Sequence, residues 1–309
     1  MHFHHPESPR ERSVSVPDIV PDPPPTPPTA TPEESGHQSR LCELATSDLL
    51  DDYLHRHLPP ETMTAVRTHM DVCERCWGRW NRHRWDAAAH HPLLSELAEF
   101  LGPRFRPYHD SSKALAAEWD SAEPRTDAEI ADFFRTSTSY LVNLTIWEAS
   151  GNRPPYVAAA LPTLEQHAVR TILDIGCGIG SDALALRAKG FTVTGCDYRS
   201  PSTRFMHHRS GGSIPVVEPA ELRETTASDA LWIIDTLDHI ADIDQTLGTL
   251  LPNTRLMITE DLTGTRKHGN QRFHHRRQYG GLTELFRVYG LKPIGNDGVC
   301  QYWRANREL

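Results

Sequence analysis

The segment HMDVCERC, residues 69–76, places one histidine and two cysteines at the spacing H-x3-C-x2-C. On a helix, His69 and Cys73 lie about one turn apart on the same face, and Cys76 follows three residues later. Imidazole and thiolate groups are the ligands of structural zinc sites, which are tetrahedral and closed by four protein ligands. With Cys42 as the fourth ligand, the segment predicts a structural zinc site that joins two short helices.

Two other kinds of chemistry fit these residues. A C-x2-C pair can be a redox dithiol, although no thioredoxin-like strand precedes this one. A catalytic zinc ion needs an open coordination position, which four protein ligands would not leave. If Cys42 were not a ligand, a catalytic zinc ion would become a stronger alternative, and His55 or His57 would compete for the fourth place.

A second chemical motif is the glycine-rich turn in TILDIGCGIGSDALALRAKG, residues 171–190. A predicted buried strand ends with Asp174, the turn places glycines at Gly176, Gly178 and Gly180, and a helix is predicted from Ser181. Glycine lets the backbone approach a ligand closely and take φ values that other residues resist. The strand before and the helix after the turn strengthen its interpretation as a nucleotide-binding loop.

The next predicted strand, FTVTGCDYRS, ends with Asp197, about twenty residues beyond the turn. An acidic side chain at this point can accept hydrogen bonds from ribose hydroxyls. An NAD-binding Rossmann domain shares this logic, but its turn is G-x-G-x-x-G. Here the spacing is G-x-G-x-G, and an acid precedes the first glycine.

Residues 165–309 resemble the class I S-adenosylmethionine (SAM)-dependent methyltransferases, through LDIGCGIG, GCD, VVEPAEL and the stretch from Asp235 to Asp261. The resemblance implies that Asp174 holds the methionine amino group, Asp197 the ribose and Glu218 the adenine amine. The turn would contact the cofactor through its backbone. The full cofactor site that we expect comprises Asp174, Gly176, Cys177, Gly178, Gly180, Asp197, Tyr198, Glu218 and Asp235.

Residues 40–90 resemble the zinc-binding anti-sigma factor domain, through an early cysteine, DDYLHRHLPPE and the H-x3-C-x2-C segment. The sequence HRH replaces residues that are acidic or glycine in that family. The resemblance implies that Cys42, His69, Cys73 and Cys76 are the ligands of a Zn²⁺ ion. It also suggests a protein partner for this module.

Methyl transfer from a sulfonium is an in-line displacement, so the protein must mainly hold the acceptor close and aligned. A general base is needed only if the acceptor must lose a proton early. His239 and Asp235, after the fourth strand, are the candidate catalytic residues, and Glu260 and Asp261 follow the fifth strand. Tyr140 and Trp147 are expected to form walls of the acceptor pocket, or else to belong only to the core.

The segment RKHGNQRFHHRRQYGG, residues 266–281, carries five basic residues and three histidines in a chain with a net charge of −9. Arginine binds carboxylates and phosphates bidentately, so Arg272, His275 and Arg276 are candidates for an anionic group on the acceptor. A solvated basic loop is the alternative. The negative net charge argues against a nucleic-acid acceptor.

The elements that position these residues follow from the pattern of apolar residues. Residues 1–38 hold ten of the 24 prolines and predict a disordered tail. Residues 39–90 predict a zinc-binding helical domain, with one helix that has Thr46 or Ser47 as its N-cap and a second helix from Pro60 to Trp85. Residues 91–309 predict a helical cap followed by alternating strands and helices, an α/β class I methyltransferase fold with helices on both faces of a Rossmann-like parallel sheet.

The sequence thus predicts a SAM-dependent methyltransferase with a small-molecule acceptor and a zinc module for docking or regulation. A non-catalytic SAM sensor that signals through the zinc module to a transcription partner such as a sigma factor, and a protein methyltransferase, are the alternatives. No run of eighteen apolar residues predicts a membrane span, and no secretory signal or disulfide framework is evident. We therefore expect a cytoplasmic protein with reduced thiols.

Overall fold

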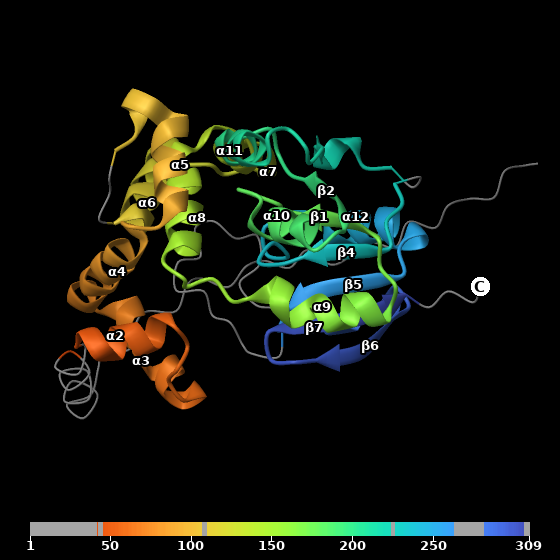
Figure 1. Ribbon diagram of the computed structural model, residues 1–309, viewed down its shortest axis with the longest axis horizontal. Helices are drawn as coiled ribbons and strands as arrows, with labels where there is room; N and C mark the ends of the chain where they lie inside the picture. The colour runs from red at the N-terminus through yellow and green to blue at the C-terminus, as the bar shows by residue number, and fades with distance from the viewer. Residues whose placement is uncertain (1–41, 43–45, 107–109, 224–225, 263–280, 306–309) are drawn as a thin grey trace, which may run out of the picture.

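The computed structural model describes residue 42 and residues 46–106, 110–223, 226–262 and 281–305. Figure 1 shows helices α2 to α8 gathered on one side of a twisted sheet. The predicted tail and the basic segment, including Arg272, His275 and Arg276, lie outside the described residues. None of the helices in the described ranges is both long and apolar enough to cross a membrane.

The sheet has seven strands in the order β3-β2-β1-β4-β5-β7-β6. The first five strands in this order are parallel, and β7 runs antiparallel between β5 and β6. The prediction of an α/β fold is therefore confirmed. One strand, β3, is short and holds only two residues. The strands are β1 (Thr171–Ile175), β2 (Thr192–Cys196), β3 (Val216–Val217), β4 (Ala230–Ile233), β5 (Leu256–Glu260), β6 (Leu291–Asn296) and β7 (Cys300–Ala305).

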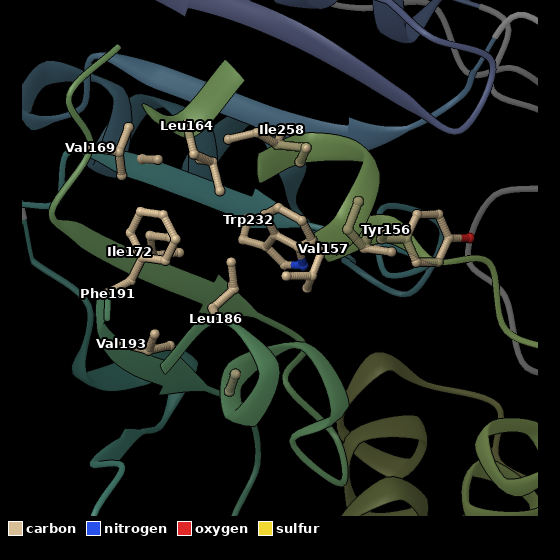
Figure 2. Close-up of a cluster of buried hydrophobic side chains, with 14 of the residues drawn as sticks. Tyr156, Val157, Leu164, Val169, Ile172, Leu186, Phe191, Val193, Trp232 and Ile258 are labelled. Carbon is tan, nitrogen blue, oxygen red and sulfur yellow. The ribbon is translucent and has the colours of Figure 1, made fainter. Parts of the chain in front are cut away.

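Helices cover both faces of the sheet, and the strand side chains alternate between two cores. On β4, Ala230 and Trp232 join one core, whereas Leu231 and Ile233 join the other. Figure 2 shows the first core, in which Trp232 lies among side chains from the strands and from the covering helices. The first core is covered by α9 (Tyr156–Gln166) and α10 (Ser181–Ala188), the second by α12 (Ile243–Leu250) and α13 (Leu282–Val288).

Four of the helices that precede the sheet lie in the segment predicted to form the cap: α5 (Pro92–Leu101), α6 (Ser111–Ala122), α7 (Asp127–Thr136) and α8 (Thr138–Ala149). Helix α8 packs against α5, α6 and α11 (Pro201–Ser210). Its Leu141 and Ile146 share a core with Ile179 of the glycine-rich turn. The cap is thus packed directly onto the turn that the sequence singled out.

The N-terminal module contains α2 (Ser47–Leu54), α3 (Pro60–Val72) and α4 (Glu74–Ala88). Thr46 caps α2 by accepting a hydrogen bond from the Leu49 amide, as its residue type predicts. The single helix predicted from Pro60 to Trp85 was wrong, because Cys73 adopts an extended conformation (φ −111°, ψ 96°) and divides it. The predicted domain boundary at residue 90 stays a prediction.

We predict that Gly176→Ala lowers Tm more than Gly190→Ala. Both glycines have positive φ (73° and 94°), so alanine costs roughly 1–2 kcal/mol at either position. At Gly176 the new Cβ would overlap the Thr236 side chain and lie 2.8 Å from Thr236 Cβ, whereas nothing lies within 4 Å at Gly190. Overpacking should add about 1–3 kcal/mol at Gly176, measured by thermal unfolding. Equal losses of Tm would contradict this packing.

Candidate functional site

The four predicted zinc ligands come together in the N-terminal module. The ligand atoms of Cys42, His69, Cys73 and Cys76 all lie within 4.8 Å of one another. His69 Nε2 lies 3.3 Å from Cys42 Sγ and 3.2 Å from Cys76 Sγ, and the sulfurs of Cys42 and Cys73 are 3.4 Å apart. Tetrahedral bonds of about 2.0–2.3 Å separate ligands by roughly 3.3–3.8 Å, so these distances fit one zinc ion.

The surroundings of these ligands shift the pKa values of Cys73, Cys76 and His69 in different directions. A backbone hydrogen bond involving Cys76 lowers the pKa of Cys73, whereas burial and the neighbouring thiols raise the pKa of Cys76 to about 12. Burial lowers the pKa of His69, which favours the neutral imidazole that binds metals. A bound Zn²⁺ ion would stabilise the thiolate form of Cys76 despite its burial.

A separate cavity of about 570 Å³ opens at the carboxyl ends of β1, β2 and β4. Ligands bind at this edge of open α/β sheets. The lining residues come from the strand ends, from α7 and α8 of the cap, and from α12. Among the predicted site residues, those that line it are Tyr140, Trp147, Asp174, Gly176, Cys177, Gly178, Asp197, Tyr198, Asp235 and His239.

The glycine-rich turn forms one wall of the cavity. Gly176, Gly178 and Gly180 all have positive φ, of 73°, 51° and 78°. The Gly176 amide donates to Cys196 O at 2.8 Å, which ties the turn to the end of β2. Gly180 does not line the cavity; a Cβ there would lie 2.5 Å from Met206 Cγ, so this glycine admits a close approach of α11. The turn therefore depends on glycine both for its φ angles and for its packing.

Asp174 lies in β1 immediately before the turn and is only 4% exposed. Its Oδ2 accepts no hydrogen bond from any described residue. Burial, and then the nearby charge of Asp182, raise the pKa of Asp174 well above its ordinary value. A buried carboxylate oxygen at the cavity wall is a fitting partner for a ligand ammonium group, which would restore the ionised form.

Asp197 follows β2 directly and faces the same cavity. Its Oδ2 accepts from the Gly178 amide at 2.8 Å and its Oδ1 from the Tyr198 amide at 2.6 Å. Burial raises the pKa of Asp197, and these hydrogen bonds oppose the rise. Each carboxylate oxygen retains acceptor capacity, so the residue can still receive hydroxyl groups of a ligand.

An ion pair that the sequence analysis did not identify completes this end of the cavity. Arg153 donates from Nη1 to Asp182 Oδ1 at 2.6 Å and from Nη2 to Oδ2 at 2.5 Å, and both residues line the cavity. The indole of Trp232 also donates to Asp182 Oδ2, at 2.7 Å. The available sequence signal was an acid in the first turn of the helix after the glycines, at a position on its buried face.

Glu218, a predicted cofactor residue, makes polar contacts with two arginines. Its Oε1 accepts from the Arg199 amide at 3.1 Å and lies 3.8 Å from Arg135 Nε. Glu218 is not among the residues that line the cavity, whereas Pro219 and Ala220 beside it are. Arg135 also lies over the ring of Tyr198, with Cζ 4.5 Å from its centroid. Contact between Glu218 and adenine therefore stays a prediction.

Aromatic side chains form the other wall of the cavity. The ring of Phe134 lies 5.0 Å from that of Tyr140 and 5.6 Å from that of His239, edge to face in both pairs. Burial, together with the negative charges of Asp197 and Asp235, raises the pKa of Tyr140, so its hydroxyl stays protonated. The catalytic candidate His239 thus lies against the ring of Phe134, at the aromatic end of the cavity.

Asp235, the other catalytic candidate, is held by an unusual backbone conformation. Its φ is +53°, a left-handed value that carries some strain for a residue with a side chain, although aspartate and asparagine tolerate it better than most. The Asp235 amide donates to Oε2 of the buried Glu260 at 3.0 Å. Strained positions of this kind concentrate at functional sites.

Comparison with known proteins gives two family matches. Residues 150–297 match the family model described as a methyltransferase domain, and residues 44–76 match a zinc-finger family model. No curated protein matches the chain in sequence.

Two of the solved structures to which the chain is similar are titled as methyltransferases. Magnesium protoporphyrin IX methyltransferase from Synechocystis, solved with bound SAM, is 12% identical with a TM-score of 0.43, covering 58% of this chain and 97% of that one. The N-methyltransferase NodS from Bradyrhizobium japonicum is 14% identical with a TM-score of 0.38, covering 50% and 99%.

We predict that Asp174→Asn stabilises the cofactor-free protein at neutral pH. Because the pKa of Asp174 is higher in the folded state, this carboxyl contributes stability at low pH that is lost as pH rises from the ordinary range through the raised value. The gain in Tm over wild type, roughly 2–4 °C per kcal/mol, should vanish below about pH 4 and be complete above the raised pKa. Thermal unfolding across pH would measure it, with the exposed Asp86→Asn as control.

We predict that Cys73→Ser abolishes stable zinc binding, since it removes one of four ligands from a closed site. The N-terminal helices should lose protection from hydrogen exchange, because metal binding supplies part of their folding free energy. Metal analysis would show about one zinc ion per chain for wild type and for the control Cys300→Ala, which lies outside the cluster. Unchanged zinc content in Cys73→Ser would refute this ligand set.

Proposed function

We propose that the chain is a SAM-dependent methyltransferase with a structural zinc module, because residues 150–297 match a methyltransferase-domain model and residues 44–76 match a zinc-finger model. The observation that carries the proposal is the buried Oδ2 of Asp174, beside the glycine-rich turn and one strand from Asp197. This arrangement presents a carboxylate for an ammonium group and a second carboxylate for hydroxyl groups, and SAM carries both kinds of group.

Different residues of the chain would contact different parts of the cofactor. Asp174 would pair with the amino group, Asp197 would accept hydrogen bonds from the ribose, and Pro219 and Ala220 would contact the adenine. The turn between Gly176 and Gly180 leaves space for the cofactor beside its backbone. When bound, SAM supplies an electrophilic methyl group on its sulfonium, and the carboxylates around the cavity favour that positive charge.

The acceptor would occupy the aromatic end of the cavity. Phe134, Tyr140 and Trp147 give walls that exclude water and hold a flat or apolar group close to the methyl carbon, and proximity is the main source of rate in such a displacement. His239 would accept a proton from the acceptor where one must leave. An acceptor space with aromatic walls of this kind supports a small molecule and an enzymatic role.

The zinc module is proposed to have a structural role. None of its four ligands lines the cavity, and four protein ligands leave no open position on the metal for chemistry. Its thiol ligands must stay reduced, which supports a reducing compartment such as the cytoplasm.

A second candidate function, a SAM sensor without turnover, is favoured by the packing of α4 against α8. Helix α4 begins beside the zinc ligands, and α8 forms a wall of the cavity. A change in the cavity could therefore reach a surface that a transcription partner would bind.

We predict that Asp197→Ala weakens SAM binding by at least tenfold. The change removes the hydrogen-bond acceptor for the ribose hydroxyls and the acceptor for the Gly178 amide. Isothermal titration calorimetry on folded variants would measure this. The control Asp229→Ala removes an acid that receives its hydrogen bonds from Arg170, Thr171 and Arg255, away from the cavity lining. Retained affinity in Asp197→Ala would refute the site.

The assay for function uses methyl-labelled SAM with cell extract separated by size. Label in small molecules supports the proposed enzyme, and its transfer should be lost in Asp197→Ala. Label in protein would favour a protein methyltransferase that recruits its substrate through the zinc module. Binding of SAM without transfer to any fraction would favour the sensor.

A further inference from the structure

The zinc module touches the loop that enters the cavity. Arg56, the second residue after α2, donates from Nη2 to Asn152 O at 3.1 Å, although 96 residues separate the two in sequence. The ring of His55 lies beside Gly151, with Cε1 3.6 Å from where a Cβ would be. The end of α2 therefore contacts two successive residues of the loop between α8 and α9.

The next residue of that loop is Arg153, which reaches the cavity. Its guanidinium is held by Asp182 through two hydrogen bonds and lies 5.3 Å from the ring centroid of Trp147. The positive charge of Arg153 opposes the rise in the pKa of Asp174. A displacement of Asn152 would thus be transmitted along the backbone to the group that offsets the negative charge around Asp174.

The position of α2 depends in turn on the metal ligands. Cys42 precedes α2, whereas the other three ligands lie on α3, on α4 and between them. The core that α2 shares with these helices is small, and its buried members are Leu50, Leu54, Val66, Met70, Cys76 and Trp80. So small a core supplies little stability alone, and metal binding contributes the remainder.

A second contact joins the same two sites. Ala88 of α4 shares a core with Leu141 and Ile146 of α8, and α8 carries the cavity residues Tyr140 and Trp147. The zinc module is therefore connected to the Arg153 loop through α2 and to the aromatic wall of the cavity through α4 and α8.

We propose that the zinc module positions Arg153 at the cofactor end of the cavity through His55 and Arg56, so that zinc and SAM each increase the affinity of the protein for the other. This inference rests on the proposed function. Arg153 is a positioning residue here, acting through Asp182 and Asp174, and Arg56 positions Arg153. Linkage requires the effect to be reciprocal, with the same factor in both directions.

The test compares SAM affinity in zinc-loaded and chelator-treated full-length protein by calorimetry. We expect removal of zinc to weaken SAM binding by roughly 5–20-fold, in the range of ordinary coupling between sites. Saturating SAM should lower the dissociation constant for zinc, measured by competition with a chromogenic chelator, by the same factor. Equal SAM affinities with and without zinc would overturn the inference.

If removal of zinc unfolds the protein, a matched pair of variants tests the contact between Arg56 and Asn152 instead. Arg56→Ala removes the hydrogen bond to Asn152 and leaves all four zinc ligands in place, so it should keep its zinc content and weaken SAM binding roughly threefold. Arg82→Ala, at an exposed position on α4, should leave SAM affinity unchanged. Equal affinities in the two variants would overturn the role of Arg56. Zinc-loaded wild type that binds no SAM would instead overturn the proposed function, and the linkage with it.

Discussion

Arg153 and Asp182 form an ion pair that joins the helical half of the chain to the sheet. Arg153 comes from the loop after α8, and Asp182 from the first turn of α10, directly behind the glycine-rich turn. Both side chains are largely buried, with 14% and 6% exposed, and Trp232 of β4 adds a hydrogen bond. Loss of either partner would leave a buried charge uncompensated, which typically costs about 3–5 kcal/mol.

This pair also sets the electrostatic character of the cavity. Asp182 raises the pKa of Asp174, and Arg153 partly offsets that effect. Carboxylates outnumber cationic groups along the described lining, where Asp174, Asp182, Asp197, Asp235 and Asp242 meet two arginines. In the cofactor-free site these carboxylates therefore repel one another. A cationic ligand reduces this repulsion, which contributes to its binding affinity.

The sequence anticipated the features that are encoded locally. The glycine turn between Asp174 and Ser181 follows from φ requirements and from the flanking strand and helix. The zinc ligands follow from the spacing of His69, Cys73 and Cys76, and only Cys42 had to be inferred across a longer separation. In the fold, the strands predicted before the glycine-rich turn and before Asp197 both appeared, because buried parallel strands are short, largely apolar runs.

What the sequence could not show depends on contacts between distant segments. The pairing of Arg153 with Asp182 spans 29 residues, and neither residue type announces its partner. The helix break at Cys73 was missed because neither proline nor glycine marks it in residues 69–76. Glu218 was assigned from resemblance, yet its contacts with Arg135 and Arg199 are tertiary.

The two edge strands of the sheet affect whether the protein aggregates at high concentration. An open edge strand offers unpaired backbone groups to other chains, and long, flat edges promote aggregation. Here one edge is β3, with only two residues, and the other is β6, which carries Lys292 and Pro293 and an irregular register between Pro293 and Gly295. Neither edge gives a neighbouring strand a regular ladder to extend, so the seven-stranded sheet is protected against growth by strand addition.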